Sequence, residues 1–465
     1  MNAASVDIAH ALPDGLIDEL AALGALGVSI PERWGGSGLG LVGACAVVET
    51  LARHDRAVAT TVGLHLGLGT RALVAFATNG QRDRWLPDLA SGRRLGAFAA
   101  TEPSAGSDLS RLATLARRDP ATGKLMVSGQ KSYVTNGALA GTFTVAVATE
   151  GLGDAQSGQN LLVLERDDGL VTGAEERKLG LRGSSTTPLY LDGVVVDQDR
   201  VIGPPGAGHR VLGQVLAYGR TAMAAGCSGT ASAALRLAAT HVAERHQFGR
   251  SLAAQPVVRA QLADMAAAVF AMRAIVAATV AVEGDVGGLE RRSLAAKVFC
   301  SEADWSVCDQ ALQLHGGSGY LEESGAPLLL RDARITRIFE GANDVLLCRL
   351  GALELARPGD LHDDAPELTD VGTLASNLRA SWLADDGLKV LRDPARLHQL
   401  GRLAVLREVA AAVAAHDGPS TDATENTRRH ALSRLRHDAQ ALARALPARA
   451  TIDHIVDPLL ATVTP

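Results

Sequence analysis

Residues 331–344 read RDARITRIFEGAND, and this stretch places a carboxylate, Glu340, in a turn between two apolar segments. Ile338 and Phe339 precede the carboxylate, and Leu346 follows it. A glutamate before a glycine is usually a solvated surface group, but burial of this turn would raise its pKa towards the range of a general base. The stretch therefore predicts two packed helices joined by a turn, with Glu340 as a candidate base.

The composition indicates a globular protein with a large core. The chain has 465 residues, 47% of them hydrophobic, and its length suits roughly three domains. A net charge of -6 gives no basic excess to neutralise phosphates, so we expect no nucleic-acid binding. The longest apolar stretch, near 266–282, is interrupted by Arg273 and is shorter than the roughly 20 apolar residues of a membrane span.

The cysteines indicate a reducing compartment. They form no CxxC pair and lie in apolar segments, so we expect neither disulfides nor a metal site. The N-terminus shows no basic start followed by an apolar run, so we expect no export and a cytoplasmic location.

The pattern of apolar residues changes along the chain and predicts an α+β fold that is mainly α. Residues 1–95 read as helices joined by short turns. Over 96–205, short runs of β-forming residues alternate with Gly, Asn and Asp turns, which is typical of an antiparallel barrel or sandwich. Residues 206–355 predict four long helices, as in a four-helix bundle. A linker over 356–371 and a helical appendage over 372–465 complete the chain.

Two segments near the start of the β region have the composition of a ligand-binding surface. In TEPSAGSD, residues 101–108, small residues let backbone N–H groups approach a ligand, and Thr101 and Ser107 add hydroxyls. Taken alone, this segment is more typical of an ordinary capped turn than of a ligand site. KSYVTNG follows at 131–137. With the Glu340 stretch, in this order and spacing, these segments resemble the acyl-CoA dehydrogenase family, flavoproteins that desaturate fatty acyl thioesters.

The resemblance implies an FAD site built from two chains, and therefore at least a dimer. The segments near 101 and 131 would line and cover the flavin ring. ERHQFGR at 244–250 and QLHGGSGY at 313–320 would reach the pyrophosphate and the dinucleotide end across a subunit interface, although each also reads as an ordinary helix C-terminus. The residues that the resemblance assigns to FAD are Phe98, Ala100, Thr101, Ser107, Tyr133, Thr135, Arg245, Gln247, Phe248, Gln313, Leu314, Gly316, Gly317, Asn343 and Asp344.

The resemblance also assigns the chemistry. Glu340 would remove the α-proton of the thioester while hydride leaves the β-carbon for the flavin. Some family members carry the base just before the arginine matched here by Arg220, but Gly219 at that place has no carboxylate. Arg220 is equally compatible with a structural ion pair. The residues assigned to the acyl-CoA are Ser107, Ser184, Tyr218, Arg220 and Gly341.

The chain departs from the family pattern at one position and extends it at another. Ala342 stands where a threonine is common, which predicts at most a modest loss of FAD retention. The appendage and RIFEGAND look like the very-long-chain branch, so a long-chain preference is a hypothesis. The appendage arginines would suit an anionic membrane surface, but we expect them to form a solvated helix face instead. They are Arg396, Arg402, Arg407, Arg428, Arg429, Arg434 and Arg436.

The sequence thus predicts an FAD-dependent acyl-CoA dehydrogenase of fatty acid β-oxidation that forms a trans-2-enoyl-CoA. We expect a homodimer or a dimer of dimers, with an electron-transfer flavoprotein as electron acceptor. Three alternatives keep the fold: a dehydrogenase of carrier-protein-bound acyl groups, a flavin oxidase or monooxygenase, and a non-catalytic scaffold.

Overall fold

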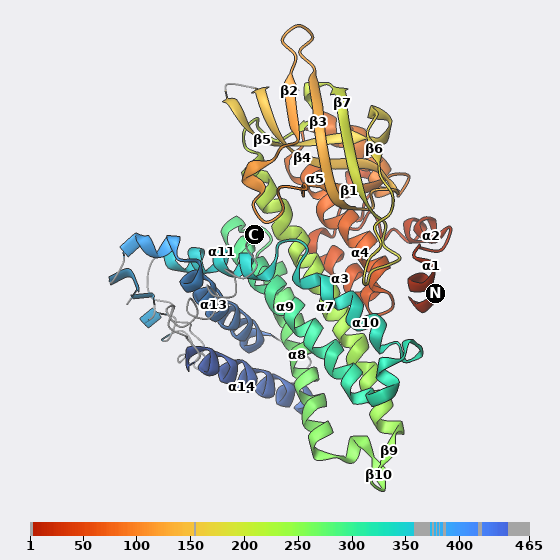
Figure 1. Cartoon of the computed structure of the whole chain (residues 1–465), viewed down its shortest axis with the longest axis vertical. Coiled ribbons are helices and arrows are strands. Elements are labelled where there is room, and N and C mark those ends of the chain that lie inside the picture. Colours follow the sequence, from red (N-terminus) through yellow and green to blue (C-terminus); the bar gives the residue numbers. More distant parts are fainter. Residues whose placement is uncertain are drawn as a thin grey trace, which may run out of the picture.

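The structure is a computed structural model of the whole chain (Figure 1). It describes residues 3–152, 155–357, 387–416 and 421–444, together with a few positions from 373 to 384. The predicted linker lies outside the described residues except for 356 and 357, and so does the appendage beyond residue 444.

The N-terminal region is helical, as predicted. A π-helical turn, His65–Gly69, follows the fourth helix. His65 is buried, contacts the carbonyl of Leu26 through Nε2 at 3.0 Å and accepts the backbone N–H of Gly96 at Nδ1 at 2.9 Å. This turn therefore connects the helices to the first strand. The helices are α1 (Ala3–Ala9), α2 (Leu16–Ala22), α3 (Gly40–Ala52), α4 (Arg56–Leu64), α5 (Arg71–Phe76) and α6 (Asn79–Ala90).

The middle region forms an eight-stranded sheet in the order β6-β7-β3-β2-β4-β5-β8, with β1 paired to β4. The predicted β domain is confirmed, but the sheet is mixed rather than purely antiparallel. Both β1 and β2 run parallel to β4. Because β3 lies between β2 and β4 in the sequence and runs antiparallel to β2, the chain reverses twice before β4 pairs with β2. The strands are β1 (Leu95–Ala99), β2 (Leu115–Arg118), β3 (Leu125–Thr135), β4 (Ala140–Leu152), β5 (Ala155–Glu165), β6 (Val171–Thr172), β7 (Thr186–Val196) and β8 (Val201–Ile202).

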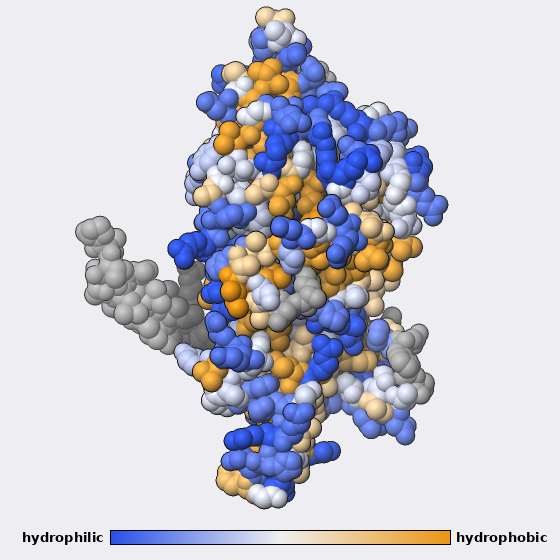
Figure 2. All heavy atoms as spheres, turned by 90° about the vertical axis from the view of Figure 1, so that its right-hand side faces the viewer, coloured by the Kyte–Doolittle hydropathy of each residue, from blue (hydrophilic) through white to orange (hydrophobic). Residues whose placement is uncertain are grey.

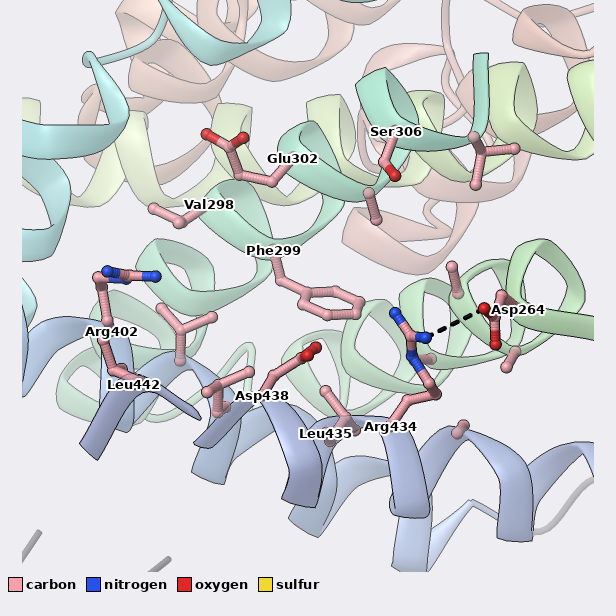
Figure 3. Close-up of a pocket in the computed structure, with 18 of the residues that line it drawn as sticks. Asp264, Val298, Phe299, Glu302, Ser306, Arg402, Arg434, Leu435, Asp438 and Leu442 are labelled. Atoms are coloured by element: carbon pink, nitrogen blue, oxygen red, sulfur yellow. Dashed lines mark hydrogen bonds and ion pairs between the residues drawn. The ribbon is translucent and has the colours of Figure 1, made fainter. Parts of the chain in front are cut away.

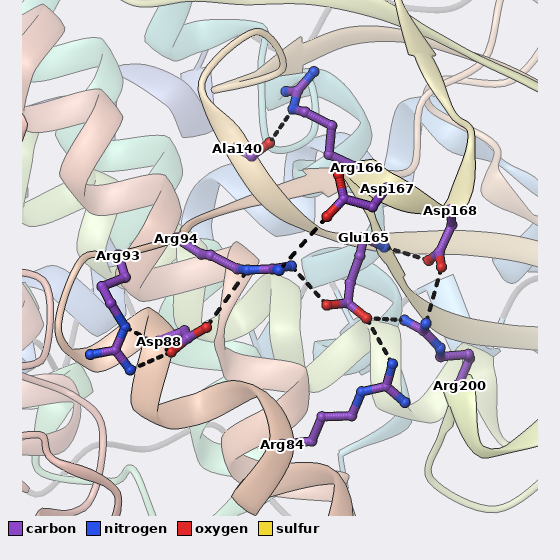
Figure 4. A network of polar contacts seen from close by, with 10 residues as sticks. All are labelled: Arg84, Asp88, Arg93, Arg94, Ala140, Glu165, Arg166, Asp167, Asp168 and Arg200. Carbon is purple, nitrogen blue, oxygen red and sulfur yellow. Dashed lines mark hydrogen bonds and ion pairs between the residues drawn. The ribbon is translucent and has the colours of Figure 1, made fainter.

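An ion-pair network fixes the helical region to the sheet (Figure 4). The carboxylate of Glu165, at the end of β5, accepts from Arg84 of α6 at 2.9 Å and from Arg94 at 2.7 Å. Arg200, which lies before β8 and is buried, donates to Glu165 at 2.8 Å and to Asp168 at 3.0 Å. Because five charged groups share these contacts, the two regions are held in one relative position.

The C-terminal bundle contains three long helices, and the predicted fourth is interrupted. The interruption separates α10 from α11 at Glu340, where the sequence predicted a turn between two helices. The hairpin of β9 (His246–Gln247) and β10 (Arg250–Ser251) lies at the bottom of the bundle in Figure 1. The helices are α7 (Gly208–Glu244), α8 (Pro256–Val280), α9 (Val286–His315), α10 (Ala326–Arg334) and α11 (Asn343–Ala356).

The described part of the appendage is helical and packs on the bundle. A Cβ at Gly351 of α11 would lie 1.9 Å from the carbonyl oxygen of Leu397 in α13 (Pro394–Ala415), so the two backbones touch. α14 (Asp422–Arg444) follows and lies against α8. Arg407 of α13 does not belong to a solvated face as predicted, because it is buried and donates to Glu354 of α11 at 2.9 Å.

Two helical stretches are long and apolar enough to cross a membrane by composition. They cover residues 56–76 and 256–280, and 72% and 50% of their apolar windows are buried within the protein. Core helices of globular proteins pass the same test, so this is weak support for a membrane span. On the face drawn in Figure 2, apolar side chains form separate patches among polar ones.

Candidate active site

Glu340 lies in a strained turn between two helical segments. A short 3-10 helix, Ile335–Arg337, extends α10, and α11 begins at Asn343. The backbone has φ 55° at Glu340 and φ 102° at Gly341. The left-handed region costs a non-glycine residue roughly 1–2 kcal/mol. Such backbone strain is common where a side chain must be aimed at a site.

The carboxylate of Glu340 is only partly hydrated. The side chain as a whole is half-buried, but Oε2 is buried and has no hydrogen-bond partner among the described residues. Burial raises the pKa of this carboxyl to about 7, although Arg220, Lys297 and Arg56 act in the opposite direction. A base with a pKa near the working pH is suited to proton transfer.

Gly219 of α7 makes room for this carboxylate. A Cβ at this position would lie 3.1 Å from Oε2 of Glu340 and 2.3 Å from a methyl carbon of Leu68 in the π-helical turn. Leu68 belongs to the same apolar cluster as Phe98 and Ala100. Leu68 thus packs beside Gly219 and also belongs to the apolar cluster of the segment predicted to line the flavin ring.

Two cations bind the turn through its backbone, the half-buried Arg220 and the fully buried Lys297. Arg220 donates from Nε to the carbonyl oxygen of Glu340 at 3.2 Å, and Lys297 of α9 donates from Nζ to that of Gly341 at 2.8 Å. The family resemblance assigned Arg220 to the acyl-CoA, and the structure places it beside the turn that carries Glu340. Lys297 was missed by the sequence reasoning, because nothing local in α9 signals that its side chain reaches a turn more than forty residues away.

The two segments predicted to line and cover the flavin ring lie side by side. Lys131 is fully buried, donates to the carbonyl of Ala100 at 3.2 Å and forms an ion pair with Glu102 at 2.7 Å. Glu102 also accepts the backbone N–H groups of Ala113 and Thr114, which fixes the 101–108 loop. Neither Lys131 nor Glu102 was predicted. A buried Lys and Glu at a spacing of 29 residues leave no periodic signal in the sequence.

Surface exposure of this region suits a planar ligand. Tyr133 is 68% exposed and has φ 56°, and Ser107 is also exposed. Thr101 and Thr135 are half-buried, while Phe98 and Ala100 are buried beneath them. The hydroxyls and the aromatic ring therefore border a surface whose floor is apolar.

The segments predicted to bind the other end of FAD meet at the far end of the bundle. The side chains of Arg245 and Gln247 are exposed, and Phe248, in the β9–β10 hairpin, is 92% exposed with φ 55°. The rings of His241 and His315 stack with centroids 4.1 Å apart, which joins the end of α7 to the end of α9. Beside them, Gln313, Gly316 and Gly317 are exposed and Leu314 is buried.

Some predicted site residues lie in the protein interior. Tyr218 is buried with its ring beneath Arg71, at 4.4 Å from the guanidinium carbon to the ring centre. Ser184 is buried too, in a loop held by Asp332, which accepts the backbone N–H of Leu181 at 2.6 Å.

The two residues predicted at the start of α11 have partners within the chain. The Asn343 amide bonds Lys297, Ser301 and Glu302. The exposed Asp344 pairs with His398 of α13 at 3.1 Å. The partners of Asn343 and Asp344 thus lie on α9 and α13, and not in the segments near 101 and 131 that are predicted to bind the flavin ring.

A cavity of about 860 Å³ lies between α8 and α9 of the bundle and α13 and α14 of the appendage (Figure 3). Phe299 and Leu435 face it, and Arg434 closes one side through its ion pair with Asp264 at 3.0 Å. Glu340 does not line this cavity. We therefore do not assign the acyl group to it, despite its size.

Comparison with known proteins agrees with this geometry. Three regions match acyl-CoA dehydrogenase domains: the N-terminal domain over residues 1–93, the middle domain over 97–194 and the C-terminal domain over 206–353. The chain belongs to the acyl-CoA dehydrogenase family. The family and the fold predicted from the sequence are therefore confirmed. Members of this family are FAD-dependent oxidoreductases, which agrees with the predicted cofactor and class of enzyme.

Individual family members show how far the likeness extends. An acyl-CoA dehydrogenase of Bacillus subtilis is 34% identical over 72% of this chain and 87% of its own length. The mouse very long-chain specific acyl-CoA dehydrogenase, a mitochondrial protein, is 36% identical over 80% of this chain. The matched part is 57% of the length of that relative. The structure of a Bacillus anthracis acyl-CoA dehydrogenase complexed with FAD has a TM-score of 0.82, with 25% identity over 97% of this chain and 86% of its own.

Proposed function

We propose that this chain is an FAD-dependent dehydrogenase that converts an acyl-CoA into its trans-2-enoyl thioester. The observation that carries the proposal is the Glu340 carboxylate, which lies in a strained turn of an acyl-CoA dehydrogenase fold and has a buried oxygen without a hydrogen-bond partner in the described part of the chain. Burial raises its pKa to about 7, so near neutral pH a large fraction is ionised and ready to accept a proton.

The residues of this chain fit a bound flavin. The floor of Phe98 and Ala100, the hydroxyls of Thr101 and Ser107 and the exposed ring of Tyr133 provide an apolar surface with polar edges. FAD bound there would supply the acceptor for the hydride that leaves the β-carbon. The buried ion pair of Lys131 and Glu102 would keep the loop in the shape that this ligand needs.

Glu340 would take the α-proton of the thioester onto its carboxylate. The negative charge that develops at the thioester carbonyl needs a nearby donor, and the backbone N–H of Glu340 is the donor that the family likeness assigns. A single donor of this kind contributes roughly 2.7–4 kcal/mol to stabilisation of the transition state. The bonds that Arg220 and Lys297 donate to the turn would keep this N–H and the carboxylate in place.

The site needs a second copy of the chain to bind the whole cofactor. The residues near Arg220 and those beyond Glu244 are separated by most of α7, which at 1.5 Å per residue is roughly 36 Å. A dinucleotide does not reach that far. The exposed segments at 245–248 and 313–317 would therefore bind the adenosine end of an FAD whose flavin ring lies in the partner, giving a homodimer or a dimer of dimers.

An electron-transfer flavoprotein is the proposed acceptor, and a long acyl chain the proposed substrate. The likeness to very long-chain specific relatives and the described helical appendage support the second point. The acyl preference can be measured directly with a series of thioesters.

The test is an anaerobic titration of the FAD-loaded protein with acyl-CoAs of increasing chain length, followed by flavin absorbance. We expect bleaching by some thioesters, which Glu340→Gln abolishes and the exposed control Glu19→Gln preserves. Size measurement of the loaded protein should give at least a dimer. Loaded flavin that no acyl-CoA bleaches would refute the proposal and favour a carrier-protein substrate or a non-catalytic role.

A further inference from the structure

The turn at Glu340 and Gly341 needs contacts with the rest of the protein to keep its backbone conformation. Two successive residues with positive φ are unfavourable, and the first is not a glycine. Such a conformation persists only where the surroundings impose it. The contacts that the turn makes therefore decide where the carboxylate lies.

Those contacts come from two helices of the bundle. The carbonyl oxygens of Glu340 and Gly341 point to cations on different helices, Arg220 of α7 and Lys297 of α9. Neither cation donates to the Glu340 carboxylate in the contacts of the described chain. The cations thus bind the backbone of the turn, and Oε2 has no hydrogen-bond partner within the described ranges.

Lys297 is held more firmly than Arg220. It is fully buried, and its ammonium also donates to Oδ1 of Asn343 at 2.7 Å. The Asn343 amide nitrogen in turn donates to Ser301 at 3.0 Å and to Glu302 at 2.6 Å, both on α9. Lys297 therefore connects α9 to Gly341 and to Asn343, on both sides of residue 342.

Burying the ammonium of Lys297 is energetically unfavourable. Burial lowers the pKa of Lys297 to about 8, because the ammonium loses its hydration. An apolar residue would fill the same space in α9 without that cost. What the ammonium adds is two directed bonds, both to the segment that follows Glu340.

We propose that Lys297 is a positioning residue for Glu340. Its ammonium, held by Asn343, fixes the turn so that the carboxylate stays aimed at the substrate and free of an ion-pair partner. The inference rests on the proposed function in one respect, namely that Glu340 is the base.

The test compares three variants of the FAD-loaded protein. Lys297→Met keeps the volume and removes the ammonium. Asn343→Ala removes the acceptor that holds it. Leu294→Ala is the matched control, because Leu294 is buried one turn earlier on α9 and does not touch residues 340–343 through any hydrogen bond.

Each variant is studied by crystallography and by steady-state kinetics. In Lys297→Met we expect the carbonyl of Gly341 to turn away and Glu340 to leave the positive-φ region. We also expect kcat to fall about 100-fold, the loss typical of a displacement near 1 Å, while KM changes by less than about threefold. Leu294→Ala should lower Tm but keep the turn and most of kcat.

The proposal is overturned if the turn in Lys297→Met is unchanged, or if this variant loses no more kcat than Leu294→Ala. Should Lys297→Met fail to fold, Asn343→Ala decides by the same two readouts. If no thioester reduces the wild-type flavin, the proposed function fails, while the crystal structures still decide whether Lys297 holds the turn.

Discussion

Replacing Glu340 by glutamine should stabilise the protein at alkaline pH. The pKa of this carboxyl rises from 4.5 to about 7 in the folded protein, with burial as the largest cause. Because the pKa of the Glu340 carboxyl is higher in the folded than in the unfolded protein, its contribution to stability is fully present below pH 4.5. That contribution is lost as the pH rises through 7. At about 1.4 kcal/mol per pH unit, keeping the ionised group in place costs about 3 kcal/mol. Water at the half-buried side chain reduces this energetic cost, so we expect Glu340→Gln to raise the free energy of unfolding at alkaline pH by about 1–3 kcal/mol.

The assay is urea unfolding at saturating FAD and fixed protein concentration, since bound cofactor and association both change apparent stability. At pH 8.5, Glu340→Gln should unfold at higher urea than the wild type. At pH 5 the difference should shrink below about 1 kcal/mol, because the wild-type carboxyl is then largely protonated in the folded state. The control Glu19→Gln, at an exposed position, should change stability by less than about 0.5 kcal/mol. Equal stability of the variant and the wild type at pH 8.5, or a difference that does not vary with pH, would refute the argument.

Three further predictions follow from the same geometry. The rate of flavin reduction should increase with pH through about 7, as Glu340 loses its proton, and a flat profile between pH 6 and 8 would contradict its role as the base. Lys131→Met leaves the Glu102 carboxylate buried without its cation, so we expect the free energy of unfolding in urea to fall by about 3–5 kcal/mol. We also expect less FAD per chain after gel filtration, and full retention of FAD would contradict the role of the 101–108 loop in holding it. In Gly401→Ala the new Cβ would lie 2.0 Å from the carbonyl oxygen of Leu347. We therefore expect the free energy of unfolding to fall by about 1–3 kcal/mol and the appendage to be proteolysed faster. An unchanged Tm would show that α11 and α13 can move apart without loss of stability.

The family, the order of the domains and the base candidate could be predicted from the sequence because each rests on local pattern. Helical and strand periodicity separates residues 1–95 from 96–205, and the turn at Glu340 is marked by a short motif. Parallel pairing of β1 and β2 with β4 was missed, because strand direction depends on where the connecting segments cross. The break between α10 and α11 was predicted as a turn, because Glu340 and Gly341 separate two apolar segments.

Tertiary structure alone decided which distant groups surround Glu340. A glycine at 219 reads in the sequence only as a missing carboxylate, whereas in the fold it is the space that Glu340 and Leu68 share. Lys297 and Arg220 are ordinary cations of helices until packing brings them to the carbonyls of one turn. The physical reason is that secondary structure follows from neighbours along the chain, while the pKa and the aim of a side chain follow from groups that packing brings together.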